Sequence, residues 1–273
     1  MVRNKRINYG IDAPPVVRNL FLAGAAGFLL WALTVLNIWS GTLVIPLFGN
    51  TLNVSIAPSA LATGAACGFM GFWMVWDSRF GKVRRRERLL NRIPWKGNEQ
   101  VLDLGCGRGL MLIGAAKRLK TGKATGVDIW QAVDLSGNRP EAVLENANLA
   151  GVAERVSVET ADMRELPFLD ESFDVVLSRA AIHNLYKIAE RSSAVSELAR
   201  VLKPGGYALI DDIRHGSEYM AVLSAHGCAD AQRLEFRPVS WLAGFLSRGS
   251  LEPVILLARK KANSTSMRPS ADA

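Results

Sequence analysis

The sequence predicts an α/β domain with a mostly parallel sheet of seven strands and helices on both faces, preceded by two transmembrane helices. Three observations lead to this fold class. Residues 19–76 are 58 consecutive positions without Asp, Glu, Lys or Arg. From residue 100 onward, short β-rich runs alternate with helical stretches, which is the pattern of an open parallel sheet. The first of these runs leads directly into a glycine-rich turn, where such sheets usually bind ligands.

The uncharged stretch is long enough for two membrane spans. Residues 20–39 would cross about 30 Å of hydrocarbon at about 1.5 Å per residue. Turn-forming Gly, Pro and Asn in residues 40–53 predict a connection. A second apolar run begins at Val54 or Ser59 and ends at Trp76, in an aromatic group typical of a membrane interface. A cleaved signal peptide is the alternative for the first span, but the apolar run is too long for one and no small-x-small cleavage site follows it.

Basic residues flank the outer ends of both spans. The net charge is +8, and residues 1–18 carry +3 while residues 77–96 carry +6. Since the loop between the spans has no Lys or Arg, the positive-inside rule predicts an integral membrane protein with both termini and the α/β domain in the cytoplasm. The basic excess borders an apolar segment, so we expect membrane lipids rather than nucleic acid as a partner.

Two features of this region leave alternatives open. Gly64 and Gly68 form a GxxxG pattern, extended by Ala60, that would pack the two spans of one chain together or the spans of two copies in a homo-oligomer. Residues 79–92 fit a helix that lies on the lipid surface with its apolar side toward lipid, or a solvated basic linker. The apolar residues concerned are Val83, Leu89, Leu90 and Ile93.

The chain is therefore divided into a cytoplasmic arm (1–18), a transmembrane hairpin (19–76), a basic juxtamembrane linker (77–96), the α/β domain (97–260) and a disordered tail (261–273). We expect the hairpin to hold the domain at the membrane without taking part in chemistry. The three cysteines, at positions 67, 106 and 228, have neither disulfide-like nor metal-like spacing, which favours a reducing compartment and no metal site.

The elements of the α/β domain follow from its apolar runs and turn residues. Strands are predicted at residues 100–104, 123–127, 156–159, 173–178 and 206–211. Helices are predicted at residues 110–120, 140–151, 189–201 and 217–226. Two late strands, near 233–237 and 253–258, would close the sheet as a hairpin. The stretch between them contains Trp241, Leu242 and Phe245, which would form core or roof the pocket.

The most specific motif is the turn after the first of these strands. Asp103 ends the strand, and Gly105, Gly107 and Gly109 let the backbone pass close to a ligand. A nicotinamide-binding turn, GxGxxG, would need a small residue at position 110, where this chain has Leu110. An acid followed by GxGxG resembles the first motif of class I S-adenosylmethionine-dependent methyltransferases. The resemblance implies a Rossmann-like fold, S-adenosylmethionine as cofactor, and Asp103 near the amino acid part of that cofactor.

Four further motifs follow in the order of that family over residues 100–212. Asp128, after the second strand, stands where a carboxylate accepts hydrogen bonds from ribose hydroxyls. Asp162 matches the family's acid that contacts the adenine amino group. The runs 173–178 and 200–206 match the fourth strand and the turn before the fifth. The resemblance implies that the cofactor is bound by Asp103, Gly105, Cys106, Gly107, Gly109, Asp128, Ile129, Trp130, Asp162, Met163 and Ser178.

Within this superfamily, the sequences at 166–168, 181–184 and 202–206 look most like the small-molecule branch that includes ubiquinone and menaquinone C-methyltransferases. The likeness covers about residues 95–212. Two features depart from it. Residues 129–139 delay the second helix, so the ribose-edge contacts would be remodelled and Trp130 would cover the cofactor. The hairpin, residues 1–76, is foreign to the soluble quinone enzymes.

Catalytic candidates follow the fourth and fifth strands. Methyl transfer from a sulfonium is an in-line displacement that needs a base only when the acceptor carries a proton. His183 lies at the ligand-binding edge, where it would act as that base or bond to a loop backbone. Asp211, Asp212 and His215 form a second set, with Asp212 and His215 the catalytic candidates. Their alternative roles are turn capping and pocket polarity.

These observations predict a membrane-anchored S-adenosylmethionine-dependent methyltransferase that acts at the cytoplasmic membrane face on a small, lipophilic acceptor. Two alternatives remain open. One is a membrane receptor that binds S-adenosylmethionine without turnover. The other is a nicotinamide-dependent reductase, which Leu110 and Asp103 disfavour.

Overall fold

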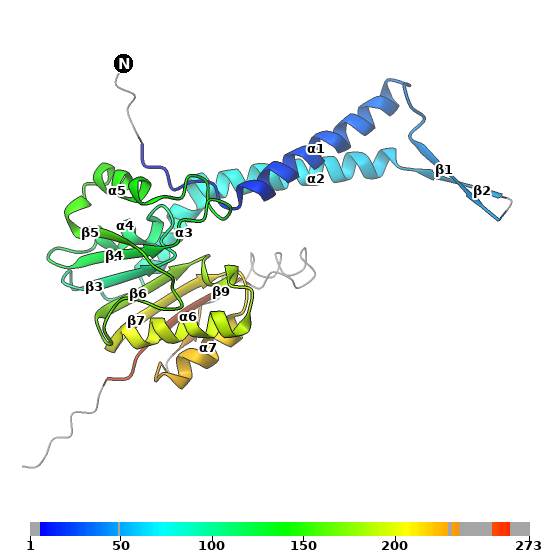
Figure 1. Ribbon diagram of the computed structural model, residues 1–273. Coiled ribbons are helices and arrows are strands. Elements are labelled where there is room, and N and C mark those ends of the chain that lie inside the picture. Colours follow the sequence, from blue (N-terminus) through cyan, green and yellow to red (C-terminus); the bar gives the residue numbers. More distant parts are fainter. Residues whose placement is uncertain (1–5, 49, 229–230, 235–252, 263–273) are drawn as a thin grey trace, which may run out of the picture. The chain divides into compact units, whose positions relative to one another are not determined.

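The computed structural model describes residues 6–48, 50–228, 231–234 and 253–262. It divides into two compact units, one formed by Gly10–Arg84 with Gln131–Asn138, and the other by the rest of the described chain. Figure 1 shows the elements of both units in chain order. The predicted stretch around Trp241, Leu242 and Phe245 and most of the predicted tail, 261–273, lie outside the described residues.

The first unit contains a hairpin of two long apolar helices. Helix α1 spans Pro14–Val35 and helix α2 spans Ala57–Trp76, and α2 continues through the π-helical turn Asp77–Gly81 into α3, Lys82–Leu90. Both are long and apolar enough to cross a membrane. A core helix of a soluble protein would bury one apolar stripe, whereas most large apolar side chains of α1 and α2 are exposed.

Glycines bring α1 and α2 into backbone contact (Figure 1). A Cβ atom on Gly27 would lie 2.6 Å from the carbonyl oxygen of Ala60, and one on Gly24 would lie 3.2 Å from the backbone nitrogen of Gly68. The predicted small-residue stripe therefore faces the other helix of the same chain. Of the two alternatives for this stripe, the structure has the intramolecular one.

The connection between α1 and α2 differs from the prediction. The sequence predicts a turn-rich connection over residues 40–53. In the structure, β1 (Thr42–Leu47) and β2 (Asn50–Ser55) form a two-stranded antiparallel sheet, paired from Thr42↔Ser55 to Leu47↔Asn50. The β-branched residues of this stretch favour an extended backbone. That preference outweighs the turn residues between which they lie.

The segment before α1 pairs with the loop Gln131–Asn138, which belongs to the same unit. Asp12 and Leu135 form an isolated antiparallel bridge, and the Ala13 backbone N–H donates to the carbonyl oxygen of Asp134 at 3.0 Å. The Asp12 carboxylate accepts a hydrogen bond of 2.8 Å from the ammonium of Lys82, whose side chain is 1% exposed. Asp12 thus joins the chain before α1 to the start of α3 and to the 131–138 loop.

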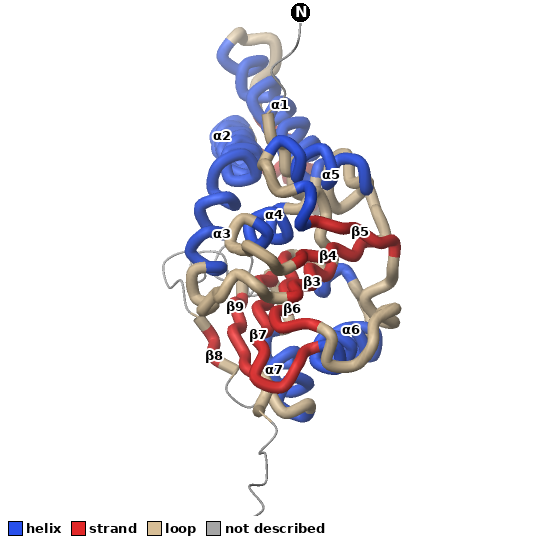
Figure 2. The backbone as a smooth tube through the Cα atoms, turned by 90° about the vertical axis from the view of Figure 1, so that its left-hand side faces the viewer, coloured by secondary structure: helices blue, strands red, loops and turns tan. Residues whose placement is uncertain are grey.

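The second unit contains a seven-stranded sheet with the order β5-β4-β3-β6-β7-β9-β8, seen in Figure 2. Its strands are β3 (Gln100–Leu104), β4 (Lys123–Asp128), β5 (Val156–Thr160), β6 (Phe173–Arg179), β7 (Leu202–Asp212), β8 (Gln232–Arg233) and β9 (Val254–Arg259). The first five are parallel, and β9 runs antiparallel to β7 and β8. The predicted seven-stranded, mostly parallel sheet with helices on both faces is confirmed. Strands β8 and β9 pair antiparallel, as expected for the two late strands, while residues 235–252 between them lie outside the described part of the chain.

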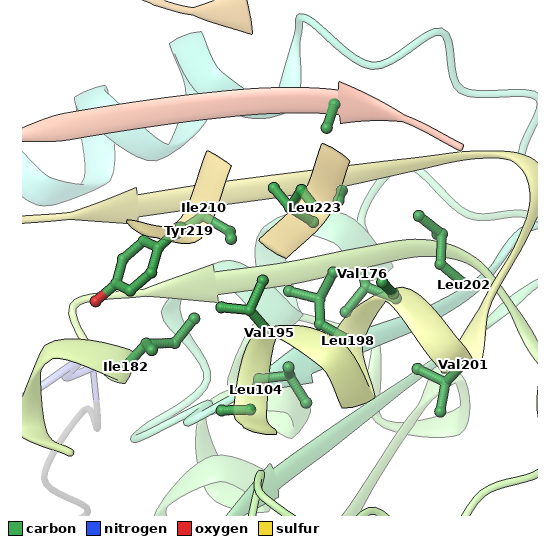
Figure 3. Packing of buried hydrophobic residues seen from close by; sticks show 14 of the residues in the cluster. Leu104, Val176, Ile182, Val195, Leu198, Val201, Leu202, Ile210, Tyr219 and Leu223 are labelled. Carbon is green, nitrogen blue, oxygen red and sulfur yellow. The ribbon is translucent and has the colours of Figure 1, made fainter. Parts of the chain in front are cut away.

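Helices cover both faces of this sheet. One face packs against α3, α4 (Leu110–Ala116) and α5 (Pro140–Leu149). The other packs against α6 (Ile188–Val201) and α7 (Gly216–Ala225), and its core is drawn in Figure 3. Short 3-10 turns occupy Ala153–Arg155 and Ile182–Asn184.

Helix α3 corrects one interpretation of the basic segment. Leu89, Leu90 and Ile93 are 1%, 0% and 4% exposed and belong to the core cluster that contains α4. The apolar side of α3 is therefore unavailable to lipid, and the interpretation of these three residues as lipid-facing is wrong. Amphipathicity alone does not distinguish a helix on a membrane from a helix on a protein core.

Candidate active site

Parallel strands bring the predicted acids to one edge of the sheet. Asp103 pairs in register with Leu177, Arg179 with Asp211, and Asp128 with Thr160. The carboxyl ends of β3, β4, β6 and β7 therefore lie along the same edge, which is where open α/β sheets bind their ligands.

The turn after β3 needs glycine, because side chains at its glycine positions would strain the backbone or clash with neighbouring atoms. Gly105, Gly107 and Gly109 have φ angles of 66°, 55° and 81°, in the left-handed region. A Cβ atom on Gly105 would lie 2.4 Å from the Cβ of Ala181. Cys106 is buried beneath the turn, where its thiol would lie 2.7 Å from a Cβ on Gly126, and burial raises the pKa of that thiol. The turn can thus offer its backbone to a ligand while the Cys106 side chain packs inward.

Asp103 provides a buried acceptor oxygen that has no donor among the described residues. It is 1% exposed, and its Oδ2 accepts a hydrogen bond of 2.8 Å from the backbone N–H of Leu112. Its Oδ1 is buried and, among the described residues, accepts no hydrogen bond. Burial raises the pKa of this carboxyl to about 8. A cationic donor such as the ammonium of an amino acid would satisfy Oδ1 and favour the ionised form.

Asp128 is held at the end of β4 by backbone donors. Its Oδ2 accepts from the Gly107 N–H at 2.8 Å and its Oδ1 accepts from the Trp130 N–H at 2.7 Å. A carboxylate oxygen can accept more than one hydrogen bond, and a ribose hydroxyl is a suitable donor. Ile129 is 49% exposed, and the Trp130 indole donates to the Thr160 hydroxyl at 2.7 Å. The two hydrogen bonds hold Trp130 between Asp128 and Thr160.

Three other predicted cofactor residues have different surroundings. Asp162 accepts hydrogen bonds from the Arg164 guanidinium, the shortest at 2.6 Å, and this pairing lowers the pKa of Asp162. The Met163 methyl would lie 3.3 Å from a Cβ on Gly105, so Met163 is at the glycine turn. Ser178 is buried and donates to the carbonyl oxygen of Leu104 at 3.2 Å. Its hydroxyl therefore joins β6 to β3.

His183 and Asp212 come together although 28 residues separate them in the chain. The His183 Nδ1 and the Asp212 Oδ1 are 2.5 Å apart, and the His183 backbone N–H donates to Oδ2 at 3.1 Å. Asp212 is 1% exposed and also accepts from the Ile213 N–H and the Tyr219 hydroxyl. A carboxylate on Nδ1 selects the tautomer with its proton there, which leaves the Nε2 lone pair as the basic site. No group in the described part of the chain hydrogen-bonds Nε2.

His215 does not join this pair. It precedes α7 with a φ of 64°, and its Nδ1 lies 3.9 Å from Glu218 Oε2. Burial is the main cause that lowers the pKa of its imidazole. Within the residues that the structure describes, it makes no hydrogen bond to His183 or Asp212. Of the three catalytic candidates, the structure brings together only His183 and Asp212.

Two residues near this edge were not anticipated from the sequence. Tyr219, buried on α7, donates its hydroxyl to Asp212 Oδ2 at 3.2 Å. Arg85, on α3, donates from Nη2 to Asp211 Oδ1 at 2.5 Å. The apolar spacing of α7 could have indicated that Tyr219 faces the sheet. No local signal identifies Arg85, because its partner lies 126 residues further along the chain.

Part of the chain is similar to known methyltransferases. Residues 102–210 match the family described as "Methyltransferase domain". A 27-O-demethylrifamycin SV methyltransferase of Amycolatopsis mediterranei is 34% identical over 165 residues, which cover 58% of this chain and 55% of that protein. A ubiquinone/menaquinone biosynthesis C-methyltransferase of Geobacter sulfurreducens is 34% identical over 133 residues, which cover 48% of each chain. The chain spans about half the length of the curated relatives it matches.

A solved structure shares the fold. A geranyl diphosphate methyltransferase in complex with S-adenosylmethionine has a TM-score of 0.52 and 18% sequence identity, and the match covers 65% of this chain and 85% of that one. Residues 102–210 therefore match a methyltransferase domain, and the described sheet and helices share the fold of a solved methyltransferase. The match supports S-adenosylmethionine as the cofactor, as the acid and glycine turn predict. Among the described residues, no group of three or more His, Cys, Asp or Glu side chains is placed to hold a metal ion.

Proposed function

We propose that this protein is a membrane-anchored methyltransferase that transfers the methyl group of S-adenosylmethionine to a small, lipophilic acceptor at the cytoplasmic membrane face. One observation carries the catalytic part of this proposal. Gly105 of the cofactor turn lies against Ala181, two residues before His183, so that a proton acceptor stands beside the cofactor turn. A protein that only binds the cofactor has no need of a His–Asp pair at that position.

The residues at this edge have distinct tasks in the proposed reaction. S-adenosylmethionine supplies an activated methyl group when bound. Asp128 accepts the ribose hydroxyls, and Asp103 accepts the ammonium of the amino acid. His183 takes the acceptor's proton at Nε2, while Asp212 holds Nδ1–H and stabilises the imidazolium that forms. Tyr219 fixes Asp212 in turn. The pair is useful only if the acceptor carries a proton to be lost, for example on a hydroxyl or an acidic carbon.

The membrane part of the proposal is supported by the hairpin. Both α1 and α2 are candidate spans with exposed apolar side chains. Near the end of α2, exposed aromatic rings follow one another along the helix, which suits a membrane interface. Those rings belong to Phe69, Trp73, Trp76 and Phe80. A membrane-held enzyme has access to acceptors that dissolve in lipid, and a quinone, the class named for the Geobacter relative, is such a molecule.

The catalytic proposal is tested with labelled cofactor and paired histidine variants. Full-length protein in native membranes receives S-adenosylmethionine with a tritiated methyl group, and the lipid extract is counted. We expect a labelled product for the wild type, strong loss of turnover in His183→Asn, and wild-type turnover in His226→Asn, whose exposed imidazole lies at the end of α7. Both variants should retain S-adenosylhomocysteine affinity. Cofactor binding with no labelled product in any acceptor fraction would instead favour the receptor alternative.

The topology is tested by reporter fusions. The basic flanks predict that a reporter after Arg92 is cytoplasmic and that one inserted between residues 41 and 50 is on the other side of the membrane. The reverse pattern would separate the domain from its cofactor, and it would count against the proposed function as well as the topology. Reporter activity on one side for both fusions would contradict two spans.

A further inference from the structure

A row of charged side chains crosses the sheet beside Asp103. Side chains alternate between the two faces of a strand, and Val101, Leu177 and Leu209 all belong to the core on the α3–α4 face. Asp103, Arg179 and Asp211 each stand two residues after one of these core residues, on the same face. Because β3, β6 and β7 are neighbours and Asp103 is in register with Leu177, Arg179 and Asp211 stand side by side two residues closer to the carboxyl edge than Asp103. Arg179 is close enough to Asp103 to lower the pKa of that carboxyl.

Arg85 adds a second guanidinium to this row from helix α3. Its Nη2 donates to Asp211 Oδ1 at 2.5 Å, while the Nε of Arg179 lies 3.4 Å from Asp211 Oδ2. The Asp211 side chain is 3% exposed, and those of Arg179 and Arg85 are 15% and 35% exposed. Two guanidiniums therefore share one buried carboxylate, and both keep some access to solvent. Guanidinium groups have five N–H donors each and bind carboxylates through paired hydrogen bonds.

The amino acid end of S-adenosylmethionine carries an ammonium and a carboxylate on the same carbon. Asp103 Oδ1, buried and without a donor among the described residues, meets the need of the ammonium. A carboxylate next to that ammonium is best bound by cationic donors close to Asp103, and Arg179 lies on the adjacent strand. Asp103 thus offers an acceptor for the ammonium, and the neighbouring guanidiniums offer donors for the carboxylate of the same amino acid.

We propose that Arg179 and Arg85 bind the carboxylate of the cofactor's amino acid, beside the ammonium site at Asp103. This inference rests on the proposed function only through its use of S-adenosylmethionine. Arg85 stands outside the family match at residues 102–210 and on the continuous helical run Ala57–Leu90 that includes the second candidate span. The cofactor is then bound in part by the segment that leads from the hairpin into the domain.

The test compares two ligands that differ by one carboxylate. Binding of S-adenosylhomocysteine and of its decarboxylated analogue to the full-length protein in detergent is measured by calorimetry. The wild type should bind the analogue about 10- to 100-fold more weakly, as expected for charge-assisted hydrogen bonds. Arg179→Gln and Arg85→Gln should weaken S-adenosylhomocysteine by a similar factor and leave the analogue within about twofold. Arg88→Gln is the matched control, because Arg88 is exposed one turn further along α3.

Each other outcome overturns the proposal. Equal wild-type affinity for both ligands would mean that no group binds the carboxylate. This comparison uses the wild type alone, so it does not depend on the folding of a variant. Folded arginine variants that retain full preference for S-adenosylhomocysteine would place the carboxylate elsewhere. Variants that lose both ligands equally would give the arginines a role in the fold alone. No binding of S-adenosylhomocysteine by the wild type would instead remove the cofactor assignment itself.

Discussion

Asp103→Asn should stabilise the ligand-free protein at neutral pH while it weakens cofactor binding. Burial is the main cause that raises the pKa of Asp103 from 3.8 to about 8, the Asp128 carboxylate adds to it, and Arg179 and the Leu112 N–H oppose it. A carboxyl with a raised folded-state pKa binds more protons in the folded state than in the unfolded state between those two values. Stability therefore falls as pH rises through that window and levels off above about pH 8.

The magnitude follows from the same window. One pKa unit corresponds to about 1.4 kcal/mol, so the rise from pH 5 to pH 8 costs the wild type on the order of 4 kcal/mol at this site. An asparagine can still accept the Leu112 N–H bond and carries no charge to desolvate. The difference in the free energy of unfolding between Asp103→Asn and the wild type should therefore increase from pH 5 to pH 8. Other titrating groups are common to both proteins and cancel in this difference.

Two assays check the direction in which stability and ligand affinity change with pH. Thermal unfolding of both proteins at pH 5, 6, 7 and 8 without ligand should give melting curves whose difference increases with pH. Calorimetry should give wild-type affinity for S-adenosylhomocysteine that increases with pH up to about 8, because the ammonium binds the ionised carboxylate. The variant should bind weakly at every pH. Parallel stability profiles for the two proteins would refute the claim that Asp103 is protonated in the ligand-free fold.

Three further outcomes follow from single contacts. Asp128→Ala should weaken S-adenosylhomocysteine by about 1.5–3 kcal/mol in calorimetry, since the ribose loses charge-assisted hydrogen bonds; unchanged affinity in a folded variant would place the ribose elsewhere. Gly27→Ala should disrupt disulfide crosslinking between cysteines introduced in α1 and α2, because the new Cβ would clash with the backbone of α2. Gly68→Ala is the control and should leave crosslinking intact, because its Cβ would lie 3.8 Å from the nearest atom, a Phe28 ring carbon. Equal crosslinking in both variants would contradict this packing. Deletion of residues 1–76 should lower the melting temperature of the remaining domain, because buried Lys82 loses Asp12; a melting temperature equal to that of the full chain would show that the arm contributes nothing.

The cofactor edge was predictable because its signals are local. Asp103 lies near the end of β3 and Asp128 is the last residue of β4, and the apolar run of each strand is visible in the sequence. Parallel strands of one sheet end at one edge. The sequence places His183 and Asp212 near each other for the same reason. It does not supply their hydrogen bond, nor the Tyr219 contact, because those depend on the path of the chain between Ala181 and Asn184 and on the packing of α7.

What the sequence could not indicate depends on partners distant in the chain. The basic helix α3 has the same amphipathic pattern whether its apolar side meets lipid or a protein core, and only the position of α4 decides between them. Arg85 is one of several arginines in that helix, and its contact with Asp211 distinguishes it from exposed Arg88. The β1–β2 sheet was missed because turn residues and β-branched residues compete in the same short stretch.

The two departures of this sequence from the methyltransferase pattern have a common explanation. One departure is the delayed helix after Asp128, and the other is the hairpin with its preceding arm. The delaying residues 131–138 pair with the chain around Asp12, and Asp12 also holds Lys82 at the start of α3. The insertion at residues 131–138 and the arm before α1, both absent from the usual methyltransferase pattern, therefore contact each other. A hairpin that only concentrated the domain at a membrane would need no contact between its arm and residues 131–138. The pairing of Asp12 and Ala13 with this insertion therefore gives the arm a structural role of its own, besides membrane attachment.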